Sequence, residues 1–218
     1  GLLQRFPSLA LKVTGNARAD FQTHDAWAGQ AEMRRALTIG TAQEAFIESV
    51  RSELRRGDGP VHVRVRGEAG IGKTRLVLET TTAEDLRPLV IYCDKPAKLL
   101  SGDLMTTLLR DDTPIDAIVV VDECDFGSQT LIWNHLQQRS PRIRLVSIYN
   151  DPEEPTGTTV TQSAPPLDDA HIVDIISGYD VPKDQAQQWA GLCDGSPRVA
   201  HVIGQNLKHN PDDLLRQP

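Results

Sequence analysis

The chain has 218 residues, a length that is enough for one α/β domain and a small accessory domain. Its residues are 39% hydrophobic and 24% charged, which is consistent with a packed globular core. A formal net charge of −7 argues against a segment that holds a nucleic-acid backbone by charge alone. The sequence contains neither an apolar run of about eighteen residues nor closely spaced cysteines, which argues against a membrane span, a metal cage and a disulfide framework. We therefore expect a globular, cytoplasmic protein.

The N-terminal part of the chain predicts little regular structure before residue 37. Residues 1–36 carry a few apolar side chains among many polar ones, and we expect a linker or the end of an upstream domain. Thr41 and Glu44 have the spacing of a capping box, which predicts a helix over residues 41–56 that begins with Thr41 as its cap. The first residue is Gly1 rather than Met, and we expect the chain to be part of a longer protein.

A glycine-rich stretch follows residues 61–66, whose alternating β-branched residues predict a strand. The stretch reads Gly67-Glu68-Ala69-Gly70-Ile71-Gly72-Lys73-Thr74 and fits the Walker A pattern, GxxxxGK[ST]. Its glycines let several backbone N–H groups point at one phosphate chain, and a helix beginning near Lys73 adds the positive end of its dipole. An ordinary glycine turn with an exposed lysine is the alternative, but the flanking strand and helix favour a phosphate-binding loop.

The residue types of this loop predict separate roles at a nucleotide. Lys73 is predicted to contact the β- and γ-phosphates and to take part in catalysis, and Thr74 to be a ligand of Mg²⁺. The whole loop and the following Arg75 are predicted to bind the nucleotide.

A second apolar run, residues 117–121, ends in Asp122 and Glu123, about fifty residues after the loop. Such runs suit central strands of a parallel sheet, and acids at the carboxyl end of a strand lie where α/β folds bind ligands. This is the Walker B pattern. Asp122 is predicted to hold Mg²⁺ and Glu123 to orient or deprotonate the attacking water.

Residues 142–150 predict a further strand that ends in polar side chains. Asn150, with Ser147 as second candidate, is placed to sense the γ-phosphate. Asn-Asp-Pro is also typical of a turn, so this alternative stays open. Three predicted helices follow in residues 165–210, the last of them opened by Gly195-Ser196-Pro197-Arg198, and 211–218 is predicted to be a tail.

Residues 37–208 resemble the AAA+ and STAND branches of P-loop NTPases. The resemblance rests on the two Walker motifs, the polar strand end and the Gly-x-Pro element at Gly195. It implies a three-layer α/β core over residues 37–164, with a mostly parallel five-stranded sheet, followed by a small all-helical lid. It also implies that Arg198 reaches the γ-phosphate from the lid and that Pro197 lies near the nucleotide. Ile39 and Gly40, just before the helix that precedes the Walker A strand, are candidates for contact with adenine, and they are equally consistent with ordinary core and turn residues.

The resemblance implies ATP or ADP with Mg²⁺ as the bound cofactor, since no guanine-specific NKxD element is present. Ring-forming AAA+ motors usually present an arginine finger after the fourth strand, but residues 150–165 contain no arginine. This favours a STAND-like switch with slow ATPase activity, flanking effector and sensor domains, and trigger-dependent homo-oligomers; bacterial members often serve in defence. The alternatives are an AAA+ motor or loader acting on protein or DNA, and a non-catalytic nucleotide-binding scaffold.

Overall fold

The computed structural model describes residues 21–110, 115–150 and 157–209. The predicted tail, 211–218, and residues 1–20 of the predicted linker lie outside this part of the chain. A mixed sheet forms the centre of the fold, with the strand order β1-β3-β4-β5-β2-β6. Its strands are β1 (Gln22–Thr23), β2 (His62–Arg66), β3 (Val90–Cys93), β4 (Ala117–Val121), β5 (Ile143–Ile148) and β6 (Thr159–Ser163).

The five strands from β2 to β6 run parallel, and they correspond to the five strands that the sequence predicts. The central strand β4 is buried along its whole length, as its unbroken apolar run requires. The predicted α/β class with a mostly parallel sheet is therefore confirmed, and β1 adds a sixth, antiparallel strand at the edge beside β3.

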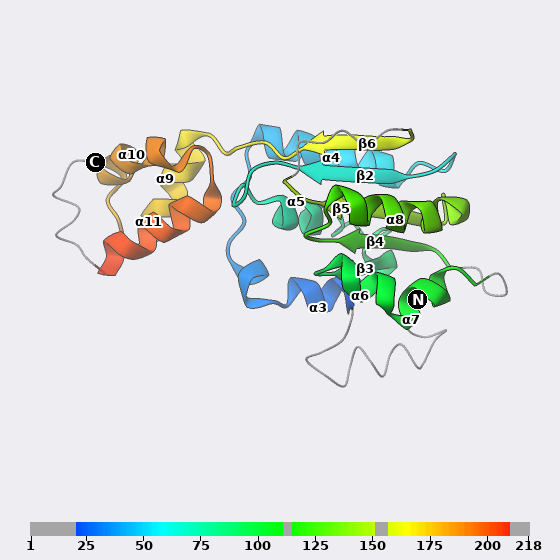
Figure 1. The fold of residues 1–218 in the computed structure, drawn as a ribbon. Helices are drawn as coiled ribbons and strands as arrows, with labels where there is room; N and C mark the ends of the chain where they lie inside the picture. The colour runs from blue at the N-terminus through cyan, green and yellow to red at the C-terminus, as the bar shows by residue number, and fades with distance from the viewer. Residues whose placement is uncertain (1–20, 111–114, 151–156, 210–218) are drawn as a thin grey trace.

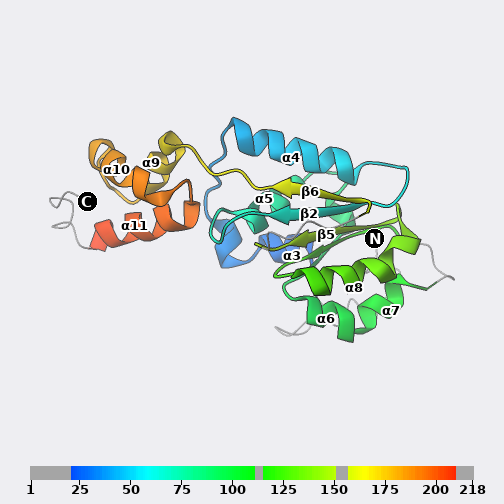
Figure 2. The same ribbon diagram turned by 45° about the horizontal axis from the view of Figure 1, so that its top comes forward.

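Helices cover both faces of the sheet and make it the middle of three layers (Figure 2). One face packs against α3 (His24–Ala28), α4 (Thr41–Leu54) and α5 (Lys73–Thr80), and the other against α6 (Pro96–Ser101), α7 (Asp103–Leu108) and α8 (Phe126–Leu136). Short 3-10 turns are η1 (Ala31–Arg34), η2 (Arg87–Leu89), η3 (Gln137–Arg139) and η4 (Gly191–Cys193). None of the helices in the described ranges is both long and apolar enough to cross a membrane.

The described part of the predicted linker, residues 21–36, packs onto the core instead of crossing solvent. Trp27 on α3 is fully buried, and its ring stacks on that of Tyr92 at a centroid distance of 4.2 Å. Arg87 also pairs with Asp25, with 2.7 Å between Nη2 and Oδ1. Two buried aromatic side chains, Phe21 and Trp27, hold this segment against the core, and a pattern based on helix or strand periodicity does not detect them.

The start of α4 differs by one residue from the predicted capping box. The cap is Gly40, whose N–H donates to Gln43 Oε1 at 3.1 Å, so Gln43 takes the place predicted for Glu44. Gln43 is buried and also donates from Nε2 to the carbonyl oxygens of Pro165 and Pro166. These bonds fix the Gln43 side chain beside the start of α4, and they explain why Gln43 rather than Glu44 completes the cap.

The C-terminal helices form a separate small layer beyond one end of the sheet (Figure 1). They are α9 (Asp169–Ser177), α10 (Lys183–Ala190) and α11 (Pro197–His209). Their apolar sides enclose a cluster of their own that includes Leu167, Ile172 and Ile176. The predicted helical lid is therefore present, with its own core.

Candidate functional site

The glycine-rich loop joins the end of β2 to the start of α5. Gly67, Gly70 and Gly72 have φ angles of +148°, +88° and +96°, which side chains other than glycine rarely allow. At Gly70 a Cβ atom would also lie 3.0 Å from Ser196 Oγ and 3.2 Å from Arg198 Cβ. The loop therefore has the backbone of a phosphate cradle, and it lies against the lid.

Lys73, the first residue of α5, is almost fully buried. Its ammonium donates to the carbonyl oxygens of Gly67 and Glu68, each at 2.8 Å, so the side chain folds back across the loop. Burial lowers the pKa of Lys73, and the nearby Asp122 carboxylate opposes that shift. The positive charge is thus held inside the loop, at the predicted phosphate position.

The two predicted metal ligands are in contact with each other. Thr74 Oγ1 donates to Asp122 Oδ2 at 2.7 Å, across the gap between α5 and the end of β4. A hydroxyl and a carboxylate are the oxygen ligands that Mg²⁺ prefers, and both come from rigid element ends. The donor set therefore fits Mg²⁺, which would be held here and would offset negative charge on the phosphates.

Glu123 follows directly and is exposed, with a φ of +49° that is uncommon outside glycine. Its N–H donates to Asp122 Oδ1 at 2.9 Å. This turn separates the two acids: Asp122 points to Thr74, and Glu123 stands free of the sheet. The arrangement leaves the Glu123 carboxylate accessible to water.

Of the two sensor candidates, Ser147 is buried and Asn150 is exposed. Ser147 Oγ lies 2.9 Å from His62 Nε2 and donates to Gln129 Oε1 at 3.2 Å, which occupies it inside the sheet–α8 layer. Within the described residues no hydrogen bond joins Asn150 to the loop. Ser147 is therefore engaged elsewhere, and the assignment of Asn150 remains a prediction.

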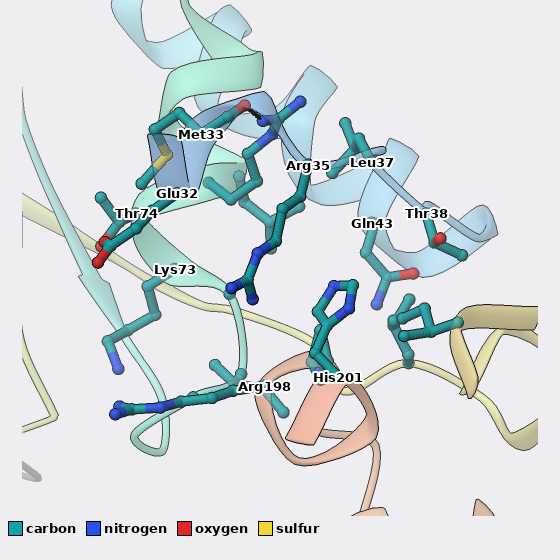
Figure 3. A pocket seen from close by; sticks show the side chains of 18 of the residues that line it. Glu32, Met33, Arg35, Leu37, Thr38, Gln43, Lys73, Thr74, Arg198 and His201 are labelled. Atoms are coloured by element: carbon teal, nitrogen blue, oxygen red, sulfur yellow. Dashed lines mark hydrogen bonds between the residues drawn. The ribbon is translucent and has the colours of Figure 1, made fainter. Parts of the chain in front are cut away.

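The lid touches the loop through the Gly-Ser-Pro-Arg element. Ser196 Oγ donates to the Gly70 carbonyl at 3.1 Å, and the Arg198 N–H reaches the same oxygen at 3.4 Å. Pro197 lies against Gly72, where an added Cβ would be 3.8 Å from Pro197 Cγ. The side chains of Lys73 and Arg198 both extend toward one region beside the loop (Figure 3).

A cavity of about 320 Å³ opens between the loop, the segment before α4 and the lid. Its lining includes eight of the predicted site residues: Gly70, Ile71, Gly72, Lys73, Thr74, Arg75, Pro197 and Arg198. The predicted residues Ile39, Gly67, Glu68, Ala69, Asp122, Glu123 and Asn150 do not line it. Ile39 nevertheless lies close to the cavity in the sequence, because the two preceding residues, Leu37 and Thr38, form part of the cavity wall.

Comparison with solved structures identifies the fold. Cdc6p from Pyrobaculum aerophilum aligns with a TM-score of 0.60 and 14% identity, over 88% of this chain and 67% of that one. The Aeropyrum pernix ORC2 protein (ADPNP-ADP complexes) aligns with a TM-score of 0.51 and 16% identity, over 80% and 63%. A STAND protein with a tetratricopeptide repeat sensor, from Pyrococcus horikoshii, aligns with a TM-score of 0.53 and 13% identity, over 85% and 33%.

The fold is that of AAA+ and STAND P-loop ATPases. No protein-family model matches the chain, and no curated protein matches it by sequence. The chain spans 67%, 63% and 33% of the three solved chains, so it corresponds to only a part of those proteins.

In this P-loop fold, the cavity has walls that the sequence patterns did not predict. Met33, Leu37, Leu167 and Ile175 line it with apolar side chains, and His201 projects from α11. Figure 3 shows Arg35 and His201 pointing toward one another. Burial and the nearby Arg35 lower the pKa of His201, and Tyr179 Oη lies 3.0 Å from its Nδ1. An apolar wall of this kind requires no fixed motif, so the sequence offers no signal for it.

Two side chains, the partly buried Arg75 and the buried Gln43, hold these walls in place. Arg75 on α5 donates from Nη1 to the Met33 carbonyl, which joins the segment before α4 to the P-loop helix. Gln43 binds the carbonyl groups of Pro165 and Pro166, which join α4 to the connection into the lid. Arg75, predicted to bind nucleotide, thus has a structural contact as well as a place in the lining.

Proposed function

We propose that this chain binds ATP or ADP with Mg²⁺ and acts as a slow ATPase that switches between two lid positions. The observation that carries the proposal is the contact of Ser196 and Arg198 with the Gly70 carbonyl. The lid element is bonded to the very loop that would hold the phosphates. A change in the bound phosphates would therefore change what the lid can contact.

Most of the predicted site residues have a role in this proposal. The loop from Gly67 to Thr74 would hold the phosphates, with Lys73 released from its own loop carbonyls to pair with them. Thr74 and Asp122 would hold Mg²⁺, and the exposed Glu123 would orient the attacking water. Arg198 and Asn150 would contact the γ-phosphate, which ADP lacks. The base would lie between the apolar walls from Met33, Leu37, Leu167 and Ile175.

Support for nucleotide as the ligand also comes from the neighbours. The ORC2 structure with the same fold was solved as ADPNP and ADP complexes. The STAND neighbour has a tetratricopeptide repeat sensor, and this chain spans 33% of that neighbour's length. By analogy we propose flanking sensor and effector domains, and homo-oligomers that form when the sensor is triggered.

The switch is favoured over a motor by the sequence between residues 150 and 165, which contains no arginine to act as a finger. A motor or loader acting on protein or DNA remains the second candidate, because the exposed Glu123 beside Asp122 would serve sustained hydrolysis equally well. A motor would show sustained turnover that rises with protein concentration or with added DNA. A scaffold with an inactive site would bind nucleotide without hydrolysis.

The first experiment identifies the nucleotide that the purified protein carries, by denaturing it and separating the extract by chromatography, alongside turnover with ATP and Mg²⁺. We expect retained ADP and slow turnover. Replacing Glu123→Gln should lower turnover by about 100-fold or more, since a positioned base contributes 10²–10⁴-fold, and leave ATP bound.

The outcomes separate the candidates. Loss of ATP binding in Glu123→Gln would overturn the role given to Glu123. Fast turnover from an empty site would favour the motor, and binding without turnover in the wild type would favour the scaffold. Asp125→Asn is the matched control, because Asp125 is an acid on the same loop that caps α8, and asparagine can also serve as a cap. This variant should leave turnover within a few-fold of the wild type.

A further inference from the structure

Asp122 accepts a hydrogen bond that neither Walker motif explains. Tyr92 Oη donates to Asp122 Oδ2 at 3.2 Å, and Thr74 Oγ1 donates to the same oxygen at 2.7 Å. The other carboxylate oxygen, Oδ1, accepts from the Glu123 N–H. Three donors thus fix both oxygens of the carboxylate, and one of them comes from a neighbouring strand.

The sheet register brings these side chains to the same face. Tyr92 on β3 pairs with Val120 on β4, and the Asp122 N–H continues the ladder to the Cys93 carbonyl at 2.9 Å. Because side chains alternate along a strand, Tyr92, Val120 and Asp122 all point to the face that carries α5. Thr74, near the start of α5, meets Asp122 there.

The N-terminal segment holds the Tyr92 ring from the other side. Tyr92 is 5% exposed, and its ring lies 4.2 Å from that of Trp27 with an interplanar angle of 7°. Its backbone also pairs with Gln22 on β1. The ring therefore cannot turn away without disturbing a fully buried tryptophan, and its hydroxyl stays aimed at Asp122.

The chemistry allows the hydroxyl only one role. An ionised carboxylate can only accept hydrogen bonds, so the Tyr92 hydroxyl is the donor in its contact with Asp122. Packing alone would be served by phenylalanine, and a buried hydroxyl lowers stability unless it is hydrogen-bonded. Its bond to the predicted magnesium ligand gives the hydroxyl a reason to be present.

We propose that Tyr92 is a positioning residue that orients Asp122 for Mg²⁺, with Trp27 holding the tyrosine ring in place. This inference rests on the proposed nucleotide site. It connects residues 21–36 with the metal end of that site, so that docking of this segment and binding of the Mg²⁺–nucleotide complex favour each other.

The test compares ADP affinity in Mg²⁺ with ADP affinity in excess EDTA, by calorimetry, for the wild type and Tyr92→Phe. The ratio of the two affinities measures the contribution of Mg²⁺. We expect Tyr92→Phe to reduce this ratio about tenfold, as for other groups that orient a metal ligand, and to leave the affinity in EDTA unchanged. Equal losses under both conditions, or an unchanged ratio, would overturn the inference.

Tyr179→Phe is the matched control, because it removes a hydroxyl from the lid that bonds His201 rather than a metal ligand. Its ratio should equal that of the wild type. In an Asp122→Asn background, Tyr92→Phe should produce no further change in the ratio; a full additional effect would show that Tyr92 does not act through Asp122.

A second measurement retains Tyr92, so that the inference can be tested even if Tyr92→Phe fails to fold. The protein would be made with 3-fluorotyrosine and with Tyr149→Phe and Tyr179→Phe, so that residue 92 alone is labelled. We expect its ¹⁹F signal to shift when Mg²⁺ is added to the ADP-saturated protein, and no shift would overturn the inference. A wild-type protein that binds no nucleotide would instead overturn the proposed function itself.

Discussion

The two ends of the candidate site, one at the phosphate-binding loop and one at the predicted base position, are held together by different kinds of contact. The phosphate end, which consists of residues 67–74 with Asp122, is joined by hydrogen bonds within the core, such as those of Lys73 to the loop and of Thr74 to Asp122. The base end, which consists of residues 33–38 with Leu167, Ile175 and His201, is walled mainly by side chains from separate elements. The phosphate end therefore exists without the lid, whereas the base end requires it.

The difference follows from what each end would bind. Phosphates need N–H donors, a cation and oxygen ligands at fixed positions, so few residue types serve. A base needs a flat apolar slot, which many residue types can form. The lid contributes Leu167, Ile175 and His201 to that slot, and backbone bonds such as Leu167 N–H to the Gly195 carbonyl at 3.0 Å join the segments of the lid.

The largest effect is expected where the lid joins the core. Gly195 has a φ of +68°, and a Cβ there would lie 2.4 Å from Pro166 Cβ and 2.7 Å from the Leu167 carbonyl oxygen. Gly195→Ala should lower the free energy of unfolding by about 2–4 kcal/mol, from backbone strain and overpacking together. Urea titration measures it.

Gly191→Ala is the matched control for this substitution. Its φ is −61°, and an added Cβ would have no neighbour within 4 Å among the described residues. Its free energy of unfolding should stay within about 1 kcal/mol of the wild type. Similar losses in both variants would show that the lid junction is not the special position.

The second effect tests the phosphate end alone. Lys73→Ala removes a buried ammonium from the loop and should weaken both ATP and inorganic triphosphate by about 10- to 150-fold, the value of a charged hydrogen bond of 1.5–3 kcal/mol. Competition with a fluorescent ATP analogue measures both ligands. Lys183→Ala, which changes an exposed lysine on α10, should leave both affinities unchanged. Unchanged affinities in Lys73→Ala would show that this loop is not a nucleotide site, and would favour the candidate in which the chain is a scaffold.

The same difference explains which parts of the molecule the sequence predicts. Strands β2 to β6, the loop and the Walker B acids follow from periodicity and from motifs whose chemistry fixes residue types. The packing of residues 21–36 depends on two isolated buried aromatic residues, Phe21 and Trp27, and the cap of α4 depends on Gln43, which also bonds the proline pair before the lid. Contacts between segments that are far apart in the sequence leave no local pattern, so the roles of Tyr92 and His201 were not predicted either.

The smallest expected effect tests the base end. His201 lines the cavity from α11, with its ring near Tyr179 Oη and facing Arg35. His201→Ala should weaken ATP by about three- to tenfold, the range for one neutral hydrogen bond or its packing, and leave inorganic triphosphate unchanged. This result would differ from that of Lys73→Ala, which should weaken the binding of both ATP and triphosphate.

His209→Ala, on the exposed last turn of the same helix, should leave both ligands unchanged and so controls for effects on α11 itself. An equal loss of ATP and triphosphate in His201→Ala would mean that the histidine acts on the phosphate end by moving Arg198. The base end would then have no independent part in binding, and the two ends would have to be treated as one site governed by the position of the lid.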